Sequence, residues 1–127
     1  MKRVLLLFGV ISICLSGFSS TRYVTQIAAG IGDGSTWLNA SADIQAMIDS
    51  SLAGDTVWVA AGTYYPTSDP LGNPSPADPR DKTFALKNGV KVFGSFAGTE
   101  ASLSQRTLAV INANASVLSG DIGIEVV

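Results

Sequence analysis

Acidic side chains are the residues of this sequence that could do chemistry most directly, because paired carboxylates act as acid and base in glycosidases and bind Ca²⁺ through oxygen. Eight aspartates are spread along the chain: Asp33, Asp43, Asp49, Asp55, Asp69, Asp78, Asp81 and Asp121. No spacing brings two of them together, since Asp43 and Asp49 fall on an expected helix and Asp55 in a turn. We therefore expect capping or solvated roles. Asp121, next to Gly120, is the best placed of them for a site.

The composition excludes several other kinds of active site. The sequence contains no histidine, which excludes histidine bases, Ser–His–Asp triads and histidine-ligated metals. Its single cysteine, Cys14, lies in a segment that we expect to be removed, so thiolate nucleophiles and thiolate metal sites are excluded from the mature chain. We expect no catalytic residue, no metal site and no cofactor in this chain. The sequence does not indicate which residues would bind a substrate.

Aromatic side chains are the remaining candidates, because their rings can stack on sugars. Four stand out: Trp37, Trp58, Tyr64 and Tyr65. Trp58 alternates with Val57 and Val59, so it faces the opposite side of a strand from the two valines. It is outward and open to a sugar if the valines are in the core, and it is in the core otherwise; we favour a packing role for Trp58.

The N-terminus predicts export. Lys2 and Arg3 precede an apolar run over residues 4–15, and small residues follow, which is the order found in signal peptides. The run is too short for the roughly 20 residues that span a bilayer. We predict a signal peptide over residues 1–19 and a mature domain over 20–127, in a secreted or cell-surface protein of a bacterium without a membrane span after cleavage. The acidic balance of the mature part and the lack of basic runs argue against nucleic-acid partners.

Short elements separated by glycine turns are expected along the mature chain. Apolar residues Ile44, Met47, Ile48 and Leu52 form one stripe of a helix over 42–52, with Ser41 as its N-cap and Gly54 after its end. All five prolines lie in residues 66–82, which we interpret as a surface loop. Strands are expected over 22–26, 56–60, 83–86, 90–94, 107–111 and 117–119. An immunoglobulin-like sandwich is the rival fold, but it does not explain the helix.

Three runs carry a family resemblance. The run Ile44–Asp49 followed by Gly54-Asp55-Thr56-Val57-Trp58-Val59-Ala60-Ala61-Gly62-Thr63-Tyr64 resembles the N-terminal cap and first coil of right-handed parallel β-helix proteins of the pectin lyase-like superfamily. Residues 84–100 and 117–123 resemble a second and a third coil of its secreted bacterial members. The resemblance implies an all-β solenoid with an amphipathic capping helix, and Tyr64 as a structural position. Such proteins usually have many more coils, so we expect a chain truncated after about three.

Two functions follow from this resemblance. The first is the N-terminal fragment of a secreted or cell-surface β-helix protein that binds extracellular polysaccharide or a surface protein, with no catalytic site in this chain. The alternative is the N-terminal part of a polysaccharide lyase or glycoside hydrolase whose active site lies in missing downstream coils. In lyases a basic residue abstracts a proton, but the cluster Arg80-Asp81-Lys82 precedes the second coil, so we expect it to be solvated.

Overall fold

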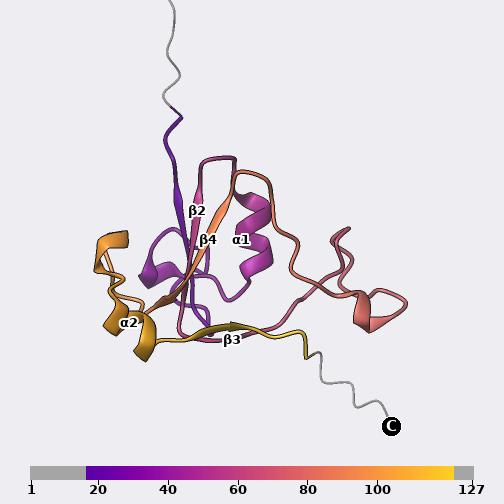
Figure 1. The fold of residues 1–127 in the computed structure, drawn as a ribbon. Coiled ribbons are helices and arrows are strands. Elements are labelled where there is room, and N and C mark those ends of the chain that lie inside the picture. Colours follow the sequence, from indigo (N-terminus) through magenta and orange to yellow (C-terminus); the bar gives the residue numbers. More distant parts are fainter. Residues whose placement is uncertain (1–16, 122–127) are drawn as a thin grey trace, which may run out of the picture.

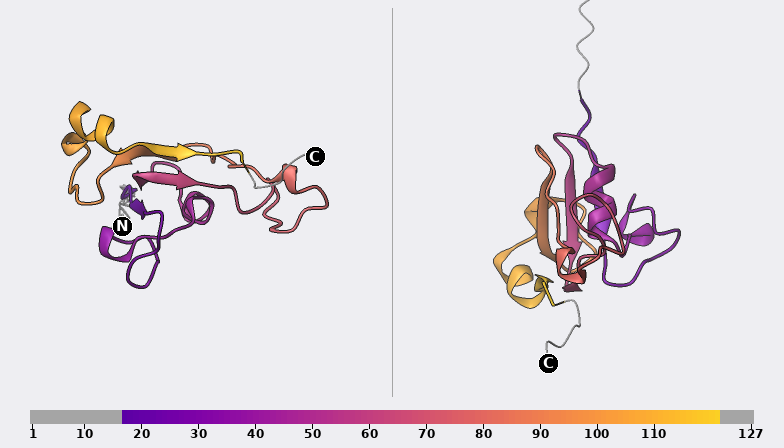
Figure 2. Two further views of the ribbon diagram at one scale, coloured as in Figure 1. Left: turned by 90° about the horizontal axis from the view of Figure 1, so that it is seen from below. Right: turned by 90° about the vertical axis from the view of Figure 1, so that its right-hand side faces the viewer.

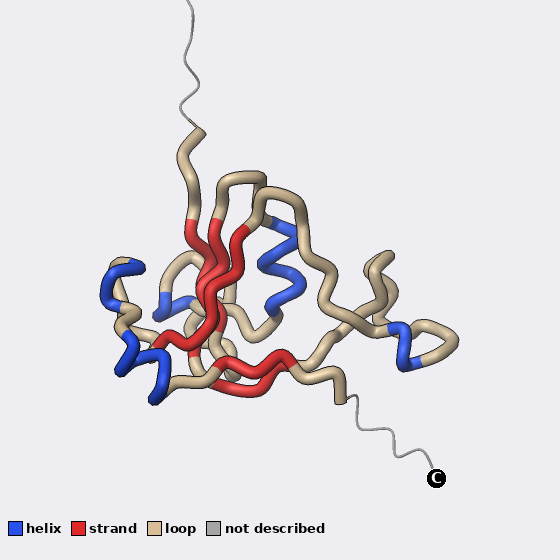
Figure 3. The backbone as a smooth tube through the Cα atoms, in the orientation of Figure 1, coloured by secondary structure: helices blue, strands red, loops and turns tan. Residues whose placement is uncertain are grey.

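The computed structural model describes residues 17–121, and most of the predicted signal peptide lies outside the described residues. Within them, two small parallel sheets are joined by long loops and two short helices (Figure 1, Figure 3). The first sheet has the order β1-β2-β4 and the second pairs β3 with β5. The strands are β1 (Thr21–Val24), β2 (Thr56–Ala60), β3 (Gly62–Tyr64), β4 (Lys91–Phe96) and β5 (Ser116–Leu118). The helices are α1 (Ile44–Ser50) and α2 (Leu108–Ala113), with 3₁₀ turns η1 (Trp37–Asn39), η2 (Pro79–Asp81) and η3 (Leu103–Gln105).

The main core lies between the three-stranded sheet and α1, which stand side by side in Figure 1. Alternation along β2 sends Val57 and Val59 toward α1, and both are fully buried or nearly so. They pack with Val24 of β1 and with Ile44 and Ile48 of α1. This is the expected apolar stripe of the helix against the expected face of the strand.

Helix α1 confirms the position of the predicted helix but is shorter at both ends. Its N-cap is Asp43, whose carboxylate accepts a 3.0 Å hydrogen bond from the backbone N–H of Ala46. Ser41, the expected cap, instead pairs through its backbone with Tyr23 and Thr25. Leu52 lies beyond the helix and is 71% exposed, so its place on the apolar stripe was wrongly predicted.

A register shift in the sheet rearranges the side chains of β4. Trp58 is opposite Phe93, but Ala60 is opposite Phe96, so β4 carries one more residue than β2 across this stretch. Ser95 accommodates it with a φ of 65°, which is unusual for a residue with a side chain. Its N–H donates to the Ser116 hydroxyl at 2.7 Å. The shift turns Phe96 onto the same face as Trp58.

That face, which points away from α1, holds a second cluster made of aromatic rings. Trp58 stacks on Phe96 with centroids 4.7 Å apart and an interplanar angle of 9°. Tyr23 meets Trp58 and Trp37 edge-on, at 5.7 and 4.8 Å. The indole of Trp37 donates to the Glu100 carbonyl at 2.9 Å. Trp58 is therefore a packing residue, as favoured, and we call this group (Tyr23, Trp37, Trp58 and Phe96) the aromatic cluster.

The fold corrects two sequence predictions, the all-β class and the β-helix resemblance. The domain is mixed α/β, with about 21% helix and 21% strand, and its short parallel sheets build no solenoid. A solenoid needs similar coils that stack one on another, whereas here the segments expected to supply the second and third coils have different structures. The pectin lyase-like resemblance is therefore wrong as a guide to this fold.

Two segments that were predicted as strands show how the local pattern failed. Residues 107–111, expected as a strand, instead contain the N-cap and the first residues of α2. The Thr107 side chain accepts a hydrogen bond from the Val110 N–H, and this cap outweighs the strand preference of the β-branched residues. Residues 83–86 form no strand, because the side-chain amide of Gln45 pairs with both the N–H and the carbonyl of Ala85, at 2.9 and 3.1 Å. This segment is attached to a helix by a side chain, not to a sheet by its backbone.

The proline-rich loop over residues 66–82 has the irregular structure expected of it. It projects away from both sheets beyond α1 (Figure 2, left). Asp69 stabilises its first bend by accepting from the N–H groups of Leu71 and Asn73, each at 2.9 Å. The first part of this loop, from Thr67 to Pro74, forms one wall of the site described next.

Candidate functional site

A groove runs along α1 and consists of two adjoining cavities. The first has a volume of about 230 Å³ and lies between the start of α1 and the end of β3. Its lining combines aromatic rings with polar groups: Tyr64, Tyr65 and Phe84, with Gln26, Asp43, Thr63 and Thr67. Ligand sites likewise combine aromatic side chains with a few polar groups, which fix the orientation of the ligand.

The second cavity has a volume of about 280 Å³ and lies between α1 and the proline-rich loop. Asp43 and Thr67 line both cavities, so they mark the point where the two adjoin. The remaining polar lining of the second cavity comes from Gln45, Asp49 and Ser68. Each cavity is smaller than the roughly 300–1,000 Å³ that holds a drug-sized ligand. Neither cavity alone is therefore large enough for a drug-sized ligand.

Local structure holds the shared carboxylate of Asp43 in place. One oxygen caps α1 through the Ala46 N–H at 3.0 Å. The other is 3.5 Å from the Thr67 hydroxyl, at the limit of a hydrogen bond. Asp49 is similar, because one of its oxygens accepts from the Gln45 amide at 2.8 Å. Both side chains thus have acceptor capacity that faces the groove.

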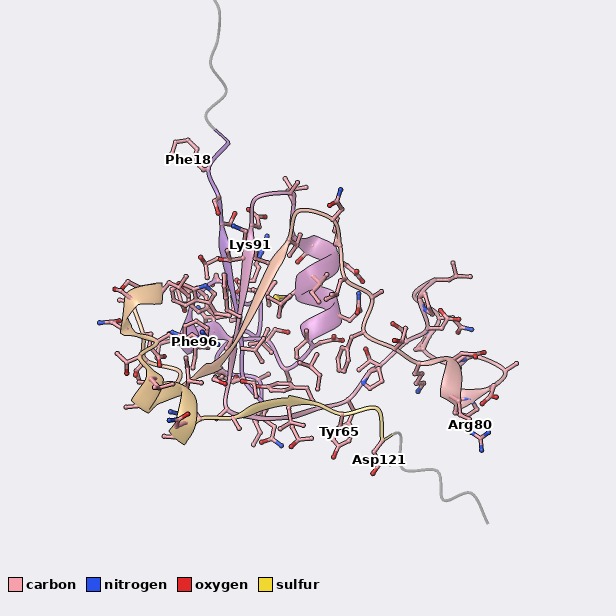
Figure 4. The ribbon with its side chains drawn as sticks, in the orientation of Figure 1. Phe18, Tyr65, Arg80, Lys91, Phe96 and Asp121 are labelled. Atoms are coloured by element: carbon pink, nitrogen blue, oxygen red, sulfur yellow. The ribbon has the colours of Figure 1, made fainter. Side chains whose placement is uncertain are left out.

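The two adjacent tyrosines differ in their surroundings. Tyr64 is 5% exposed and donates its hydroxyl to the Ala60 carbonyl at 3.0 Å, and burial raises the pKa of Tyr64 to about 12. Tyr65 is 53% exposed and points outward at the end of β3 (Figure 4). Alternation along a strand puts neighbouring residues on opposite sides. Tyr64 therefore serves the core, whereas the Tyr65 side chain points to the opposite side of the strand, and Tyr65 also belongs to the lining of the first cavity.

The structure separates the four aromatic residues that the sequence suggested for sugar stacking. Trp37 and Trp58 belong to the aromatic cluster on the far face of the sheet. Tyr64 and Tyr65 both line the first cavity. Of the four, Tyr65 is the one that both lines the groove and is more than half exposed.

Several aspartates have structural roles, as the sequence predicted. Asp55 is 5% exposed and accepts from the N–H groups of Leu52 and Ser20, at 2.8 and 2.7 Å, and these bonds lower its pKa. Hydrogen bonds from the side chain and backbone of Ser35 likewise lower the pKa of Asp33. Asp78 caps η2. These carboxylates stabilise turns.

Glu100, which the sequence did not single out, is the most thoroughly hydrogen-bonded acid. Burial of its carboxylate acts to raise its pKa, but backbone N–H donors outweigh burial, and the pKa lies below its usual value. The donors include Ala97, Gly98 and Thr99, at 2.7–3.0 Å. Glu100 holds the loop that covers the aromatic cluster.

The other predicted candidates lie apart from the groove. Arg80 and Asp81 are exposed on η2, at the far end of the proline-rich loop (Figure 4). Asp121 is exposed at the end of the described residues, near where β3 and β5 end. Among residues 17–121, no group of three potential metal-ligating side chains comes together.

Three lining residues had no signal in the sequence: Gln26, Thr67 and Phe84. They come from three separate loops, so no local motif contains two of them. Their proximity depends on the parallel pairing of β1 with β2 and on the attachment of Ala85 to Gln45. Only the folded chain brings these residues to one cavity.

Comparison of the chain with known protein families, with curated proteins and with solved structures finds no match. The pectin lyase-like resemblance thus has no support from relatives either. None of the helices in the described part of the chain is long and apolar enough to cross a membrane.

Proposed function

We propose that this protein is an exported polysaccharide-binding protein that holds a sugar chain in the groove beside α1 without cleaving it. The observation that carries the proposal is Tyr65, a residue that is 53% exposed and belongs to the lining of the first cavity. Sugar rings have an apolar C–H face, and an aromatic ring presented to solvent is a suitable platform for it. The buried aromatics of this protein have no such free face.

Polar groups around Tyr65 supply the other half of sugar recognition. Gln26 and Thr63 can each donate and accept hydrogen bonds, and Asp43 accepts. Sugar hydroxyls need this combination at the rim of the ring. The second cavity continues the same polar lining along α1, which favours a polymer over a free monosaccharide.

The expected signal peptide over residues 1–19 supports export of the protein out of the cell, where polysaccharides are available. The arrangement of carboxylates supports binding without catalysis. The three acids with lowered pKa values, Asp33, Asp55 and Glu100, stabilise turns and lie outside the lining of both cavities, so they supply no general acid there.

The test is a binding screen of the full chain against soluble neutral, amino and acidic polysaccharides, followed by calorimetric titration with oligosaccharides of the best polymer. We expect Tyr65→Ala to weaken binding by roughly tenfold or more, and Tyr65→Phe to retain it, because the ring face is what binds. Product analysis in the same samples should detect no shortened chains.

The matched control is Leu38→Ala, which removes an 83% exposed apolar side chain outside the groove. It should leave the affinity unchanged. Equal affinity of Tyr65→Ala and the unaltered protein would contradict the proposed site, and release of shorter oligosaccharides would contradict the non-catalytic role. Circular dichroism confirms that each variant is folded.

A further inference from the structure

The groove has a charge pattern that selects among polysaccharides. Two carboxylates line it, Asp43 at the junction of the cavities and Asp49 in the second cavity. No lysine or arginine belongs to the lining of either cavity. The local field is therefore negative, and it opposes any ligand that carries carboxylate or sulfate groups.

One cation lies beside the groove, at the backbone of Asp49. The ammonium of Lys87 donates to the backbone carbonyls of Ser51 and Asp49, at 2.6 and 3.0 Å. It satisfies carbonyl groups at the end of α1, and no ion pair joins it to the Asp49 carboxylate among the described contacts. The two groove carboxylates are thus bonded to neutral donors, the Ala46 N–H, the Thr67 hydroxyl and the Gln45 amide.

A carboxylate with spare acceptor capacity binds a cationic donor more strongly than a neutral one, because the hydrogen bond is charge-assisted. Among sugars, the cationic donor is the protonated amine of an amino sugar. Tyr65 and Asp43 both belong to the lining of the first cavity, so a sugar that contacts Tyr65 in this cavity would have a carboxylate on the same lining. The next unit along the groove would meet Asp49.

We infer that the ligand of this groove is a polysaccharide with free amino-sugar units, whose ammonium groups are held by Asp43 and Asp49 while a ring stacks on Tyr65. The inference rests on the proposed function and adds the class of ligand. Charge complementarity carries it: an acidic groove without basic residues, in a chain whose formal net charge is −2.

The test compares three hexasaccharides by calorimetric titration of the full chain: glucosamine, N-acetylglucosamine and galacturonate. The pH is kept low enough for the amines to be protonated. We expect the glucosamine hexamer to bind about tenfold more tightly than its acetylated form, with a preference that shrinks as salt is added. The galacturonate hexamer should bind more weakly than either.

Asp49→Asn is the decisive variant, because asparagine keeps the shape and hydrogen-bonding capacity but removes the charge. It should reduce the affinity for the glucosamine hexamer severalfold more than the affinity for the acetylated hexamer, so that the preference between the two shrinks. Asp43→Asn should act in the same direction, and asparagine retains the N-cap of α1. Asp81→Asn, an equal change of charge outside the groove, should have no effect.

The outcomes separate this inference from the proposed function. Equal binding of the two glucosamine forms, or tightest binding of galacturonate at a site lost in Tyr65→Ala, would overturn the amino-sugar class while the proposed function stands. Binding of none of the hexamers and none of the screened polymers would overturn both.

Discussion

The aromatic cluster and the groove lie on opposite sides of the three-stranded sheet and use the same kind of side chain in different ways. In the cluster, Trp58 and Phe96 are 7% and 0% exposed and stack on each other. In the groove, Tyr65 is 53% exposed and has no partner ring among the described contacts. A ring with both faces covered stabilises the fold, whereas a ring with one free face is available to a ligand.

The loss of stability on removing an aromatic side chain should distinguish the cluster from the groove most clearly. Trp58→Ala empties a packed position between Tyr23 and Phe96, so we expect it to lower the free energy of unfolding by about 3–5 kcal/mol. Urea denaturation followed by circular dichroism measures this loss. A loss below about 1 kcal/mol would mean that the cluster is not a true second core.

Trp58→Phe is the matched control for that experiment. The indole N–H of Trp58 is buried without a hydrogen-bond partner among the described residues, which is unfavourable. Phenylalanine removes this group and keeps an aromatic ring for Phe96. Its effect on stability should therefore be much smaller than that of alanine.

The pH dependence of stability should reveal the carboxylate that closes the cluster. The folded pKa of Glu100 is lowered, so its contribution is complete above the unfolded pKa and is lost as the pH falls through the folded pKa. Glu100→Gln removes that charge-assisted contribution, and we expect a loss of about 1.5–3 kcal/mol at neutral pH. The two proteins should converge in stability toward acid. A difference that stays constant from neutral to acidic pH would contradict this role.

The smallest effects should come from the two tyrosines and should sharpen the contrast within one strand. Tyr64→Phe removes a buried hydroxyl that donates to Ala60, and we expect a loss of about 1 kcal/mol in the free energy of unfolding. Tyr65→Ala removes a largely exposed ring, so stability should change by no more than about 0.5 kcal/mol. A larger destabilisation by Tyr65→Ala would assign Tyr65 to the core.

Local patterns predicted those elements that do not depend on distant partners. The β-branched run over 56–60 is strand β2, and the apolar stripe starting at Ile44 is helix α1. The proline-rich segment is a loop, as five prolines require. In each case the interactions that decide the conformation lie within a few residues.

Predictions were wrong where a contact from elsewhere competed with the local pattern. Residues 83–86 alternate like a strand, yet Gln45 occupies the backbone groups of Ala85. Phe96 reaches the aromatic cluster only because Ser95 takes a φ of 65° in a register shift. The β-helix prediction assigned three strands that do exist, β2, β4 and β5, to the repeated coils of a solenoid, which the chain does not form.

The sequence alone determined that catalysis through histidine is excluded, that the strand at β2 has one aliphatic face, and that aromatic residues were the candidates for binding. Only the tertiary structure decided which aromatic is free: Tyr65, and not Trp37, Trp58 or Tyr64. It also placed Asp43 and Asp49 in one groove with Tyr65. The physical reason is that exposure and proximity depend on which segments pack together, and the segments that line the first cavity lie as far apart in the sequence as Gln26 and Phe84.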